Sequence, residues 1–582
     1  MSLHSINTQV RSHARFYQDI AWKSNSSETH DEPALSRNVN IIEELSTICA
    51  NSIALDDASE IEAASPSFSK VLQSEQKKLA RVSRAELRDD ALALFEGLPS
   101  NVRDSFPIEV KFITCAVQTS GCFWFGSNQG AVRWRESEGW RYFAGERWLP
   151  DDSVASIASY HENSICILTE TGATLFRSVL ITLDEKAAEY EAQIKSRHNR
   201  MGFVATCVLE NPDDLRTSIH EATDNDGLWT ALYVWAEALR YSVTGELEAK
   251  ENAMSSVRAL LRLVSVTGIS GFPARAIILE DERVRQSDPG PNWYPSPVEL
   301  GVFYKNDTSS DEIAAHFLAW YVASEFVATP DEKAAVAEVC RSVMNHILDN
   351  DFMLVGPTGK RTSWGVWNPK FLNDDAEWRW ERGLNSLEIL SHLKVAIRLC
   401  GDSRFEEAYQ SLVAEYGYAN NTLEQKVVPP FAENNHSDDE LAACAYYPLL
   451  ILETDSTLKD IYLRSLERTQ EILRPEGSPF YNFLYTACTG KPCDEEASWR
   501  FLRETPLDLR HWNVTNSHRK DIKIQMEPDR FHRPQTKKTL SPAERYLHKW
   551  NSNPFRADGG DTGKTEEDGT FWLLAYWLGR RR

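Results

Sequence analysis

Three short motifs place several carboxylates directly ahead of apolar segments. They are "DNDG" at 224–227, "SSDE" at 309–312 and "HSDDE" at 436–440. A serine or an acid at a helix start is a good N-cap, and acids in the first turn interact favourably with the helix dipole. Capping uses a single residue per helix, so the additional carboxylates in these motifs indicate chemistry.

Two carboxylates that face each other across a cleft can hydrolyse a glycosidic bond. One donates a proton and therefore needs a raised pKa, and the other acts as base or nucleophile. We expect His436 to tune a neighbouring carboxylate by hydrogen bonding. The expected pair is Asp226 with one of Asp311, Glu312 or Asp438, and Asp439 is a further candidate.

The long connections between the apolar segments are rich in Trp, Asn, Arg and Gly, as in "PNWYPSP" and "RTSWGVWNPKFLNDDAEWRWERG". Aromatic faces stack on the apolar faces of sugar rings, and amide, carboxylate and guanidinium groups match pairs of hydroxyls. Anchoring of a loop is the alternative role for each Trp. The candidate substrate contacts are Asp224, Arg275, Trp293, Trp364, Trp367, Asn385, Asn482, His518, Arg519 and Asp568.

The elements that must position these residues are helices. Six segments are apolar nearly all round, which is typical of interior helices: 224–241, 307–326, 382–399, 436–452, 478–488 and 565–579. Amphipathic segments with one charged face alternate with them. The alternation predicts an (α/α)6 toroid over residues 181–582. The inner helices of a toroid run parallel, so their acidic N-termini are expected to meet at one mouth.

Residues 106–180 have the pattern of β-strands. "CFWFGSNQGAVRW" and "SICILTETGATLFR" each contain two β runs joined by a turn, and Gly130 and Gly172 are one propeller-blade length apart. This segment resembles the two-component-regulator type of propeller repeat. Two copies cannot close a ring, so we expect a small N-terminal β appendage on a mainly α protein. Residues 1–105 are polar, and we expect them to be partly helical.

Residues 183–582 resemble the six-hairpin (α/α)6 superfamily of carbohydrate-active enzymes. The resemblance rests on the helix alternation and on "DNDGLWTALY", "DTSSDEIAAHF", "NHSDDELAACAYYPL" and "EEDGTFWLLAYW". It implies an enzyme that acts on an oligosaccharide or polysaccharide, as a glycoside hydrolase or as a lyase. In the lyase alternative, His436 or Tyr447 abstracts the proton beside a uronate carboxylate. Arg275, Arg519 and Asn385 would neutralise that carboxylate.

Charge helps to choose between the two reactions. Lys and Arg total 63 against 86 Asp and Glu, which gives a net charge of −23. A rim of carboxylates would repel a uronate, so hydrolysis of a neutral or cationic glycan is favoured. A glycan-binding sensor without catalysis is a second alternative. The acidic balance also argues against nucleic acid and anionic membrane surfaces as partners.

No cofactor or metal is expected from the motifs. A Ca²⁺ ion at the acidic rim is an alternative, because this cation binds several carboxylate and amide oxygens. The N-terminus has no apolar h-region, and no apolar run is long enough to span a membrane, so we expect a cytoplasmic protein. The ten cysteines include no CxxC pair and are expected to be small buried hydrophobes.

Overall fold

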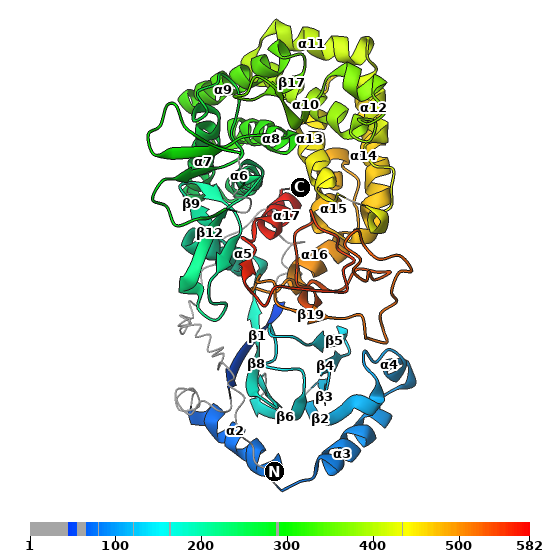
Figure 1. The fold of residues 1–582 in the computed structure, drawn as a ribbon. Coiled ribbons are helices and arrows are strands. Elements are labelled where there is room, and N and C mark those ends of the chain that lie inside the picture. Colours follow the sequence, from blue (N-terminus) through cyan, green and yellow to red (C-terminus); the bar gives the residue numbers. More distant parts are fainter. Residues whose placement is uncertain are drawn as a thin grey trace, which may run out of the picture.

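The computed structural model describes residues 45–54, 66–79, 81–119, 121–161, 164–286, 290, 292–433 and 435–581. The predicted polar start of the chain therefore lies mostly outside the described residues. Figure 1 shows a helical part, which holds the candidate site, and a β-rich part beside it.

Six helices form the interior of the helical part. They are α6 (Asp226–Thr244), α8 (Ser310–Phe326), α10 (Arg382–Cys400), α13 (Ser437–Leu452), α15 (Pro479–Thr489) and α17 (Thr570–Arg580). Each contacts the next in this order, and α17 contacts α6. We call this closed arrangement the helical ring (Figure 1). Its helices are buried almost all round because they are apolar on every face, as the sequence predicts.

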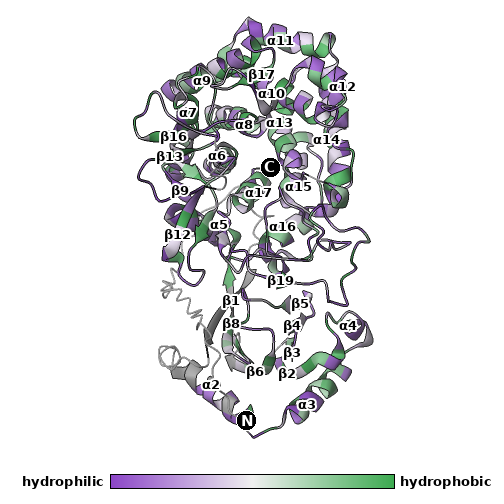
Figure 2. Ribbon diagram, in the orientation of Figure 1, coloured by the Kyte–Doolittle hydropathy of each residue, from purple (hydrophilic) through white to green (hydrophobic). Residues whose placement is uncertain are grey.

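A second set of helices covers the ring from outside. They are α5 (Leu183–Gln193), α7 (Leu247–Ser265), α9 (Pro330–Asp349), α11 (Ser403–Ala414), α14 (Ser456–Leu473) and α16 (Glu495–Glu504). Their buried residues recur at helical spacing on one face, and polar residues occupy the other (Figure 2). Each of these helices corresponds to one predicted amphipathic segment. Capping boxes begin α5 at Thr182 and α9 at Thr329.

Two antiparallel four-stranded sheets make up the β-rich part. One has the order β2-β3-β4-β5, with β2 (Ile113–Thr119), β3 (Cys122–Ser127), β4 (Gly130–Arg135) and β5 (Gly139–Phe143). The other has the order β1-β8-β7-β6, with β1 (Leu45–Ala54), β6 (Val154–His161), β7 (Ser164–Thr169) and β8 (Gly172–Ile181). Helices α2 (Pro66–Leu79), α3 (Arg84–Glu96) and α4 (Ser100–Asp104) precede β2.

The two predicted repeats form equivalent hairpins. The Ser127 hydroxyl donates to the Gly130 carbonyl at 2.8 Å, and the Thr169 hydroxyl donates to the Gly172 carbonyl at 3.0 Å. Strand β1 was not predicted, because it lies in the polar region before residue 105. It pairs with β8 along its whole length and completes the second sheet.

Short strands tie the connections of the helical part together. They are β9 (Asn199–Arg200), β10 (Phe203–Val204), β11 (Cys207–Leu209), β12 (Ser218–Ala222), β13 (Ile277–Leu279), β14 (Arg285–Gln286), β15 (Trp293–Pro295), β16 (Val302–Lys305), β17 (Met353–Val355), β18 (Arg361–Val366), β19 (Val514–Thr515), β20 (Asp558–Gly559) and β21 (Thr565–Glu566). One further short helix, α12 (Tyr418–Asn421), follows α11. Residues 505–569 form a long connection with little regular structure that reaches the β-rich part.

A cavity of about 720 Å³ lies between β5, α16 and this long connection. Among the inner-helix starts it touches only the turn before α15, through Gly477, and none of the three acidic motifs lines it. The acids of its lining are paired with arginines, for example Glu504 with Arg141 at 2.7 Å. Within the part of the chain that the structure describes, no helix is long and apolar enough to cross a membrane.

Candidate active site

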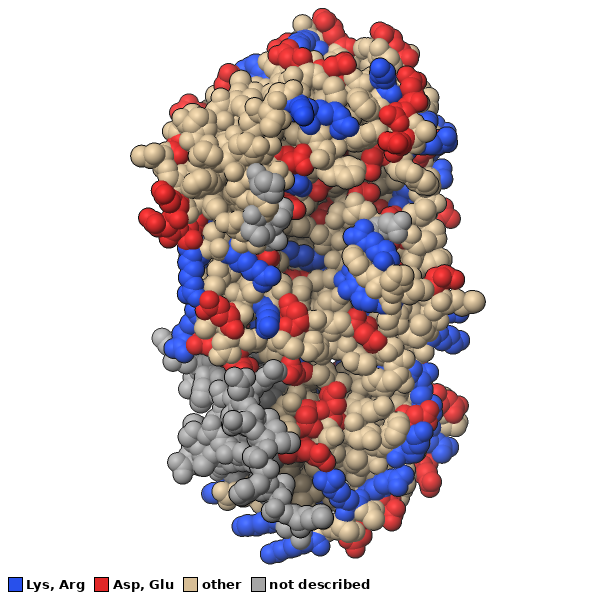
Figure 3. All heavy atoms as spheres, viewed as in Figure 1, with Lys and Arg blue, Asp and Glu red and all other residues tan. Residues whose placement is uncertain are grey.

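Three half-buried carboxylates lie at the N-terminal ends of neighbouring ring helices. Asp311 is in the first turn of α8, Glu381 immediately precedes α10, and Asp438 is in the first turn of α13. Each keeps part of its surface accessible although protein surrounds it. Asp and Glu side chains are visible within a hollow at the centre of the helical ring in the space-filling view (Figure 3).

The charges of these carboxylates act on one another. Burial raises the pKa of Asp438 well above its usual value, and the negative charges of Glu381 and Asp311 add to the rise. Burial also raises the pKa of Glu381, with a contribution from Asp311. The pKa of Asp311 is raised by burial, while Arg275 and the Ser309 hydroxyl oppose that rise. Asp438 therefore holds a proton more strongly than Asp311 does.

A second layer of carboxyls lies beneath the mouth and is fully buried. The Trp550 indole donates to Glu440 at 2.7 Å, and the Trp367 indole donates to Glu388 at 2.9 Å. Burial raises the pKa of Glu440 to about 8 and that of Glu388 well above its usual value. These groups are neutral acids near pH 7, and they form a floor that adds little negative charge to the site.

Glu312 has a helix-capping role that the sequence motif did not predict. Its carboxylate accepts hydrogen bonds from the Ser309 backbone and hydroxyl, so it closes a capping box on α8. It is fully buried, and burial raises its pKa to about 8. The expectation that Glu312 meets substrate is therefore corrected to a role in holding the helix start beneath Asp311.

Asp226 also lies below the surface, with 1% of its side chain exposed. The Thr223 backbone and hydroxyl both donate to it at 2.8 Å, and Arg200 lies 3.5 Å away. Burial raises its pKa to about 6. The prediction of Asp226 as one member of the reacting pair is corrected, because its carboxylate is held within the start of α6 and does not reach the hollow.

Arg275 connects the starts of two inner helices. Its guanidinium donates to the Asp224 carbonyl at 2.5 Å, to Asn225 at 2.9 Å and to the Ser309 hydroxyl at 3.1 Å. It also lies 3.6 Å from Glu312. These contacts fix the approach to α6 and α8, so Arg275 serves the site by positioning.

The rim beside α6 carries two lysines. Lys305 is paired with the half-exposed Asp224 and lies over the ring of Trp293. On the α17 side, Lys549 lies 3.8 Å from Asp568 and stacks over Trp229 at 4.4 Å. Asp568 also accepts from the Thr570 backbone at the start of α17. Asp224, Trp293 and Asp568, which were predicted to contact substrate, are each partnered here by a lysine that the motifs did not single out.

Aromatic residues gather between β18 and α10. Trp364 is 54% exposed, and its ring lies 6.2 Å from that of Trp378. Asp307, just before α8, binds the Ser363 backbone and hydroxyl at 2.8 and 2.9 Å, which holds this strand beside the mouth. Trp380 is exposed as well. These rings are available for stacking on a sugar.

Comparison with known proteins adds little to this description. No family model and no curated protein sequence matches the chain. One similar solved structure is a thermostable endoglucanase from Alicyclobacillus acidocaldarius, with 10% identity and a TM-score of 0.37, covering 79% of this chain and 96% of that one. Another is a Zn-binding triple mutant of a GH family 9 endoglucanase, with 12% identity and a TM-score of 0.36, covering 81% and 93%. Likeness at this level carries no argument about activity.

Three other residues that were predicted to contact substrate, Trp367, Asn385 and Asn482, lie away from the hollow. Trp367 is fully buried under it, and Asn385 donates from the same layer to the Val366 carbonyl at 2.8 Å. Asn482 is held between outer helices by Gln470 at 2.7 Å and Ser498 at 3.0 Å.

Three further residues that were predicted at the mouth, Tyr447, His518 and Arg519, lie elsewhere in the structure. Tyr447 lies in the C-terminal half of α13 with its ring tilted against that of Trp235, and its hydroxyl accepts from Arg581 at 2.9 Å. His518 and Arg519 contact Tyr142 of the β-rich part, and Arg519 is paired with Asp521 and Glu544. The predicted place at the mouth is therefore wrong for all three. Tyr447 lies at the opposite end of the ring, and His518 and Arg519 lie at the junction with the β-rich part.

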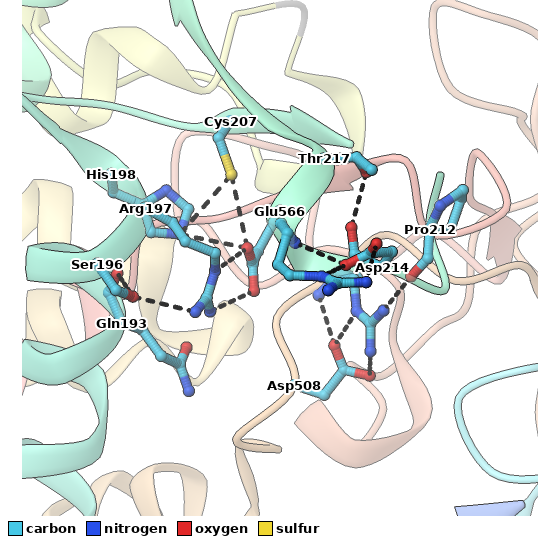
Figure 4. A network of polar contacts seen from close by, with 12 residues as sticks. Gln193, Ser196, Arg197, His198, Cys207, Pro212, Asp214, Thr217, Asp508 and Glu566 are labelled. Carbon is cyan, nitrogen blue, oxygen red and sulfur yellow. Dashed lines mark hydrogen bonds and ion pairs between the residues drawn. The ribbon is translucent and has the colours of Figure 1, made fainter. Parts of the chain in front are cut away.

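The acidic segment before α17 enters a buried polar network (Figure 4). Arg197 donates to both carboxylate oxygens of Glu566, at 2.8 and 2.9 Å. Cys207 and His198 lie 3.5 Å from the same carboxylate. Because Arg197 already neutralises Glu566, this network fastens β11 and β21 to the end of α5.

Sequence reasoning missed Glu381, Lys305 and Lys549. Glu381 carries a usable signal, because it stands at the N-cap position of an apolar helix, beside the first-turn positions that acids of the three motifs occupy. The two lysines carry none, because they lie in connections whose path is set by long-range packing.

Proposed function

We propose that the helical ring is an (α/α)6 toroid that hydrolyses glycosidic bonds at its acidic mouth. In this proposal Asp438 is the proton donor and Asp311 is the base or nucleophile. The observation that carries it is the unequal environment of these two accessible carboxylates. Asp438 lies among Glu381, Asp439 and Glu433, which favours its protonated form, whereas Asp311 lies beside Arg275, which favours its ionised form.

The surroundings support a neutral or cationic glycan. A uronate would meet several carboxylates, while the two rim lysines are already paired with Asp224 and Asp568. The exposed rings of Trp364 and Trp380 offer stacking faces next to the mouth. The elimination mechanism has no comparable support, because Tyr447 and Arg519 lie elsewhere and Arg275 is engaged in helix contacts.

The test uses release of reducing ends from a panel of neutral oligosaccharides and polysaccharides. Asp438→Asn and Asp311→Asn should each lower kcat/KM by about 10²–10⁴-fold, the usual contribution of a general acid or base. Asp374→Asn is the matched control, because this exposed acid lies in the connection before α10 and should leave turnover unchanged. Thermal unfolding of all three variants should stay close to that of the wild type.

Three outcomes would contradict the proposal. Full activity in Asp311→Asn or Asp438→Asn would remove the assigned pair. Formation of an unsaturated uronate product would establish elimination. Binding of glycans without release of any reducing end would assign the protein to the sensor class.

A further inference from the structure

A group of polar side chains beside the mouth takes no direct part in the proposed bond cleavage, although the charge of Asp439 acts on Asp438. His436 precedes α13, Asp439 is in the first turn of this helix, and Glu476 lies in the turn between α14 and α15. One nitrogen or oxygen of each lies within 4.8 Å of those of the other two. The His436 Nδ1 and the Glu476 Oε1 are 3.7 Å apart.

These side chains are buried, with 7% of His436, 2% of Asp439 and 2% of Glu476 exposed. Both ring nitrogens of His436, the Asp439 Oδ1 and the Glu476 Oε1 have no hydrogen-bond partner among the described residues. A buried polar atom without a partner costs about 1–3 kcal/mol. Four such atoms in one place therefore indicate that a bound species completes them.

We propose that His436, Asp439 and Glu476 bind a divalent transition-metal ion such as Zn²⁺. An imidazole and two carboxylates are ligands that suit this class of ion, whereas Ca²⁺ prefers oxygen ligands alone. The Tyr481 hydroxyl and the Ser478 hydroxyl are also buried without a partner among the described residues, and Ser478 lies two residues from Glu476. The Tyr481 hydroxyl is near enough for the charges of Asp439 and Glu476 to act on it.

The spacing of the ligands agrees with a metal site in its unliganded form. Ligands of a tetrahedral zinc ion are about 3.4 Å apart, because zinc bonds to N and O are about 2.0–2.1 Å long. The 3.7 Å between His436 and Glu476 needs a shift of a few tenths of an ångström. The three ligand atoms lie within 4.8 Å of one another, so the other pairs must close by at most about 1.4 Å. Because all three groups stand at helix ends or in a turn, side-chain rotation can supply it.

The surrounding charge also favours a cation. Lys426 binds the other oxygen of Asp439 at 2.7 Å and also binds Glu433, and the buried Arg545 acts on Glu476. Even without Asp438, which the proposed reaction keeps protonated, the acids Asp439, Glu433 and Glu476 outnumber these two cations. A bound cation would meet this excess of negative charge.

A second group, His198 with Cys207 and Glu566, has comparable spacing. It is a weaker site, because Arg197 holds both oxygens of Glu566 and the Ala205 carbonyl lies 3.0 Å from His198 Nδ1. It serves as the internal control for the experiment. A metal bound there would have a thiolate ligand, which the proposed site lacks.

The experiment titrates the full chain, after removal of metals with a chelator, with Zn²⁺ in a calorimeter. One ion per chain should bind the wild type. His436→Ala and the nearly isosteric Glu476→Gln should each weaken binding at least tenfold, and Cys207→Ser should leave it unchanged. Circular dichroism checks that every variant is folded. The readout needs no glycan, so it succeeds or fails independently of the proposed hydrolysis.

Replacement of Zn²⁺ by Co²⁺ gives a second readout. The cobalt spectrum of the wild type should lack a thiolate-to-cobalt charge-transfer band. Absence of binding to the wild type, unchanged affinity in both His436→Ala and Glu476→Gln, or a thiolate band that disappears in Cys207→Ser would each overturn the proposal.

Discussion

Burial sets the protonation of the acids at the centre of the ring. Glu440 shows the effect most simply, because the Trp550 indole donates to one of its oxygens and no described residue hydrogen-bonds the other. Its pKa is about 8 in the folded protein and about 4.3 in an unfolded chain. Between these pH values the folded protein binds the proton more tightly, so its stability falls as pH rises.

Replacement of Glu440 by Gln should flatten this dependence. The Gln oxygen can still accept from Trp550, but no proton is lost as pH rises. Between pH 5 and 7 the free energy of unfolding of the wild type should fall more steeply than that of Glu440→Gln, by about 1.4 kcal/mol per pH unit. Urea denaturation across this range measures both slopes. Parallel slopes would show that Glu440 is ionised in the folded state.

Glu381 gives a prediction for the pH dependence of activity. Its negative charge helps to raise the pKa of Asp438. If Asp438 is the proton donor, activity falls at high pH when it ionises, and Glu381→Gln should move this alkaline limb of kcat/KM to lower pH. Glu377→Gln, an exposed acid in the same connection, is the control and should leave the profile in place. A shift to higher pH would contradict the assignment of Asp438.

At the scale of elements, the ring helices depend on close packing at their ends. Gly383 in the first turn of α10 approaches the backbone of residues 424 and 425, and a Cβ added there would lie 2.3 Å from the Gln425 nitrogen. A contact this short with backbone cannot be relieved by a side-chain rotation. The start of α10, and with it Glu381, is therefore fixed by the segment just after α12.

Gly383→Ala should destabilise the protein by about 1–3 kcal/mol, the usual cost of overpacking. Gly97→Ala is the matched control, because this Gly also has a negative φ and an added Cβ would come no nearer than 3.4 Å to another atom. Thermal and urea unfolding of both variants provide the measurement. Equal stabilities would mean that the α10 start can move aside.

The elements were predictable where one residue property dominates. Helices that are apolar on every face, such as "SDEIAAHFLAWYVASEF" of α8, can only lie inside, and their alternation with amphipathic helices gives the order of the helical part. Strand β1 was not predictable, because its pairing with β8 joins segments far apart in the chain. Within "HSDDE" the sequence locates the acids, but the surrounding turns decide that Asp438 is accessible while Asp439 and Glu440 are buried.

At the scale of the whole molecule, the β-rich part is joined to the helical part by buried polar contacts. The Arg147 guanidinium donates to the Arg545 carbonyl at 2.6 Å and to the Arg510 carbonyl at 2.8 Å. Arg141 is paired with Glu504 of α16. The long connection before α17 thus lies between the two parts and binds both.

Arg147→Ala should weaken this junction, because each buried carbonyl left without a donor costs about 1–3 kcal/mol. Differential scanning calorimetry should show a lower melting temperature and a wider separation between the unfolding of the two parts. Arg84→Ala, which removes an exposed pair with Glu170, should change the melting temperature little. Identical melting curves for the two variants would contradict the proposed coupling.

The closure of the ring by α17 has a consequence during protein synthesis. This helix packs between α6 and α15, and its Trp572 and Tyr576 are buried against the outer helices α5 and α16. The ribosome makes α6 long before α17, so an apolar face of α6 stays uncovered in the nascent chain until residue 580 emerges. Contacts between such distant segments slow folding, and an exposed apolar face invites aggregation. Ribosome-bound chains that end before residue 570 are therefore expected to bind chaperones that recognise apolar segments.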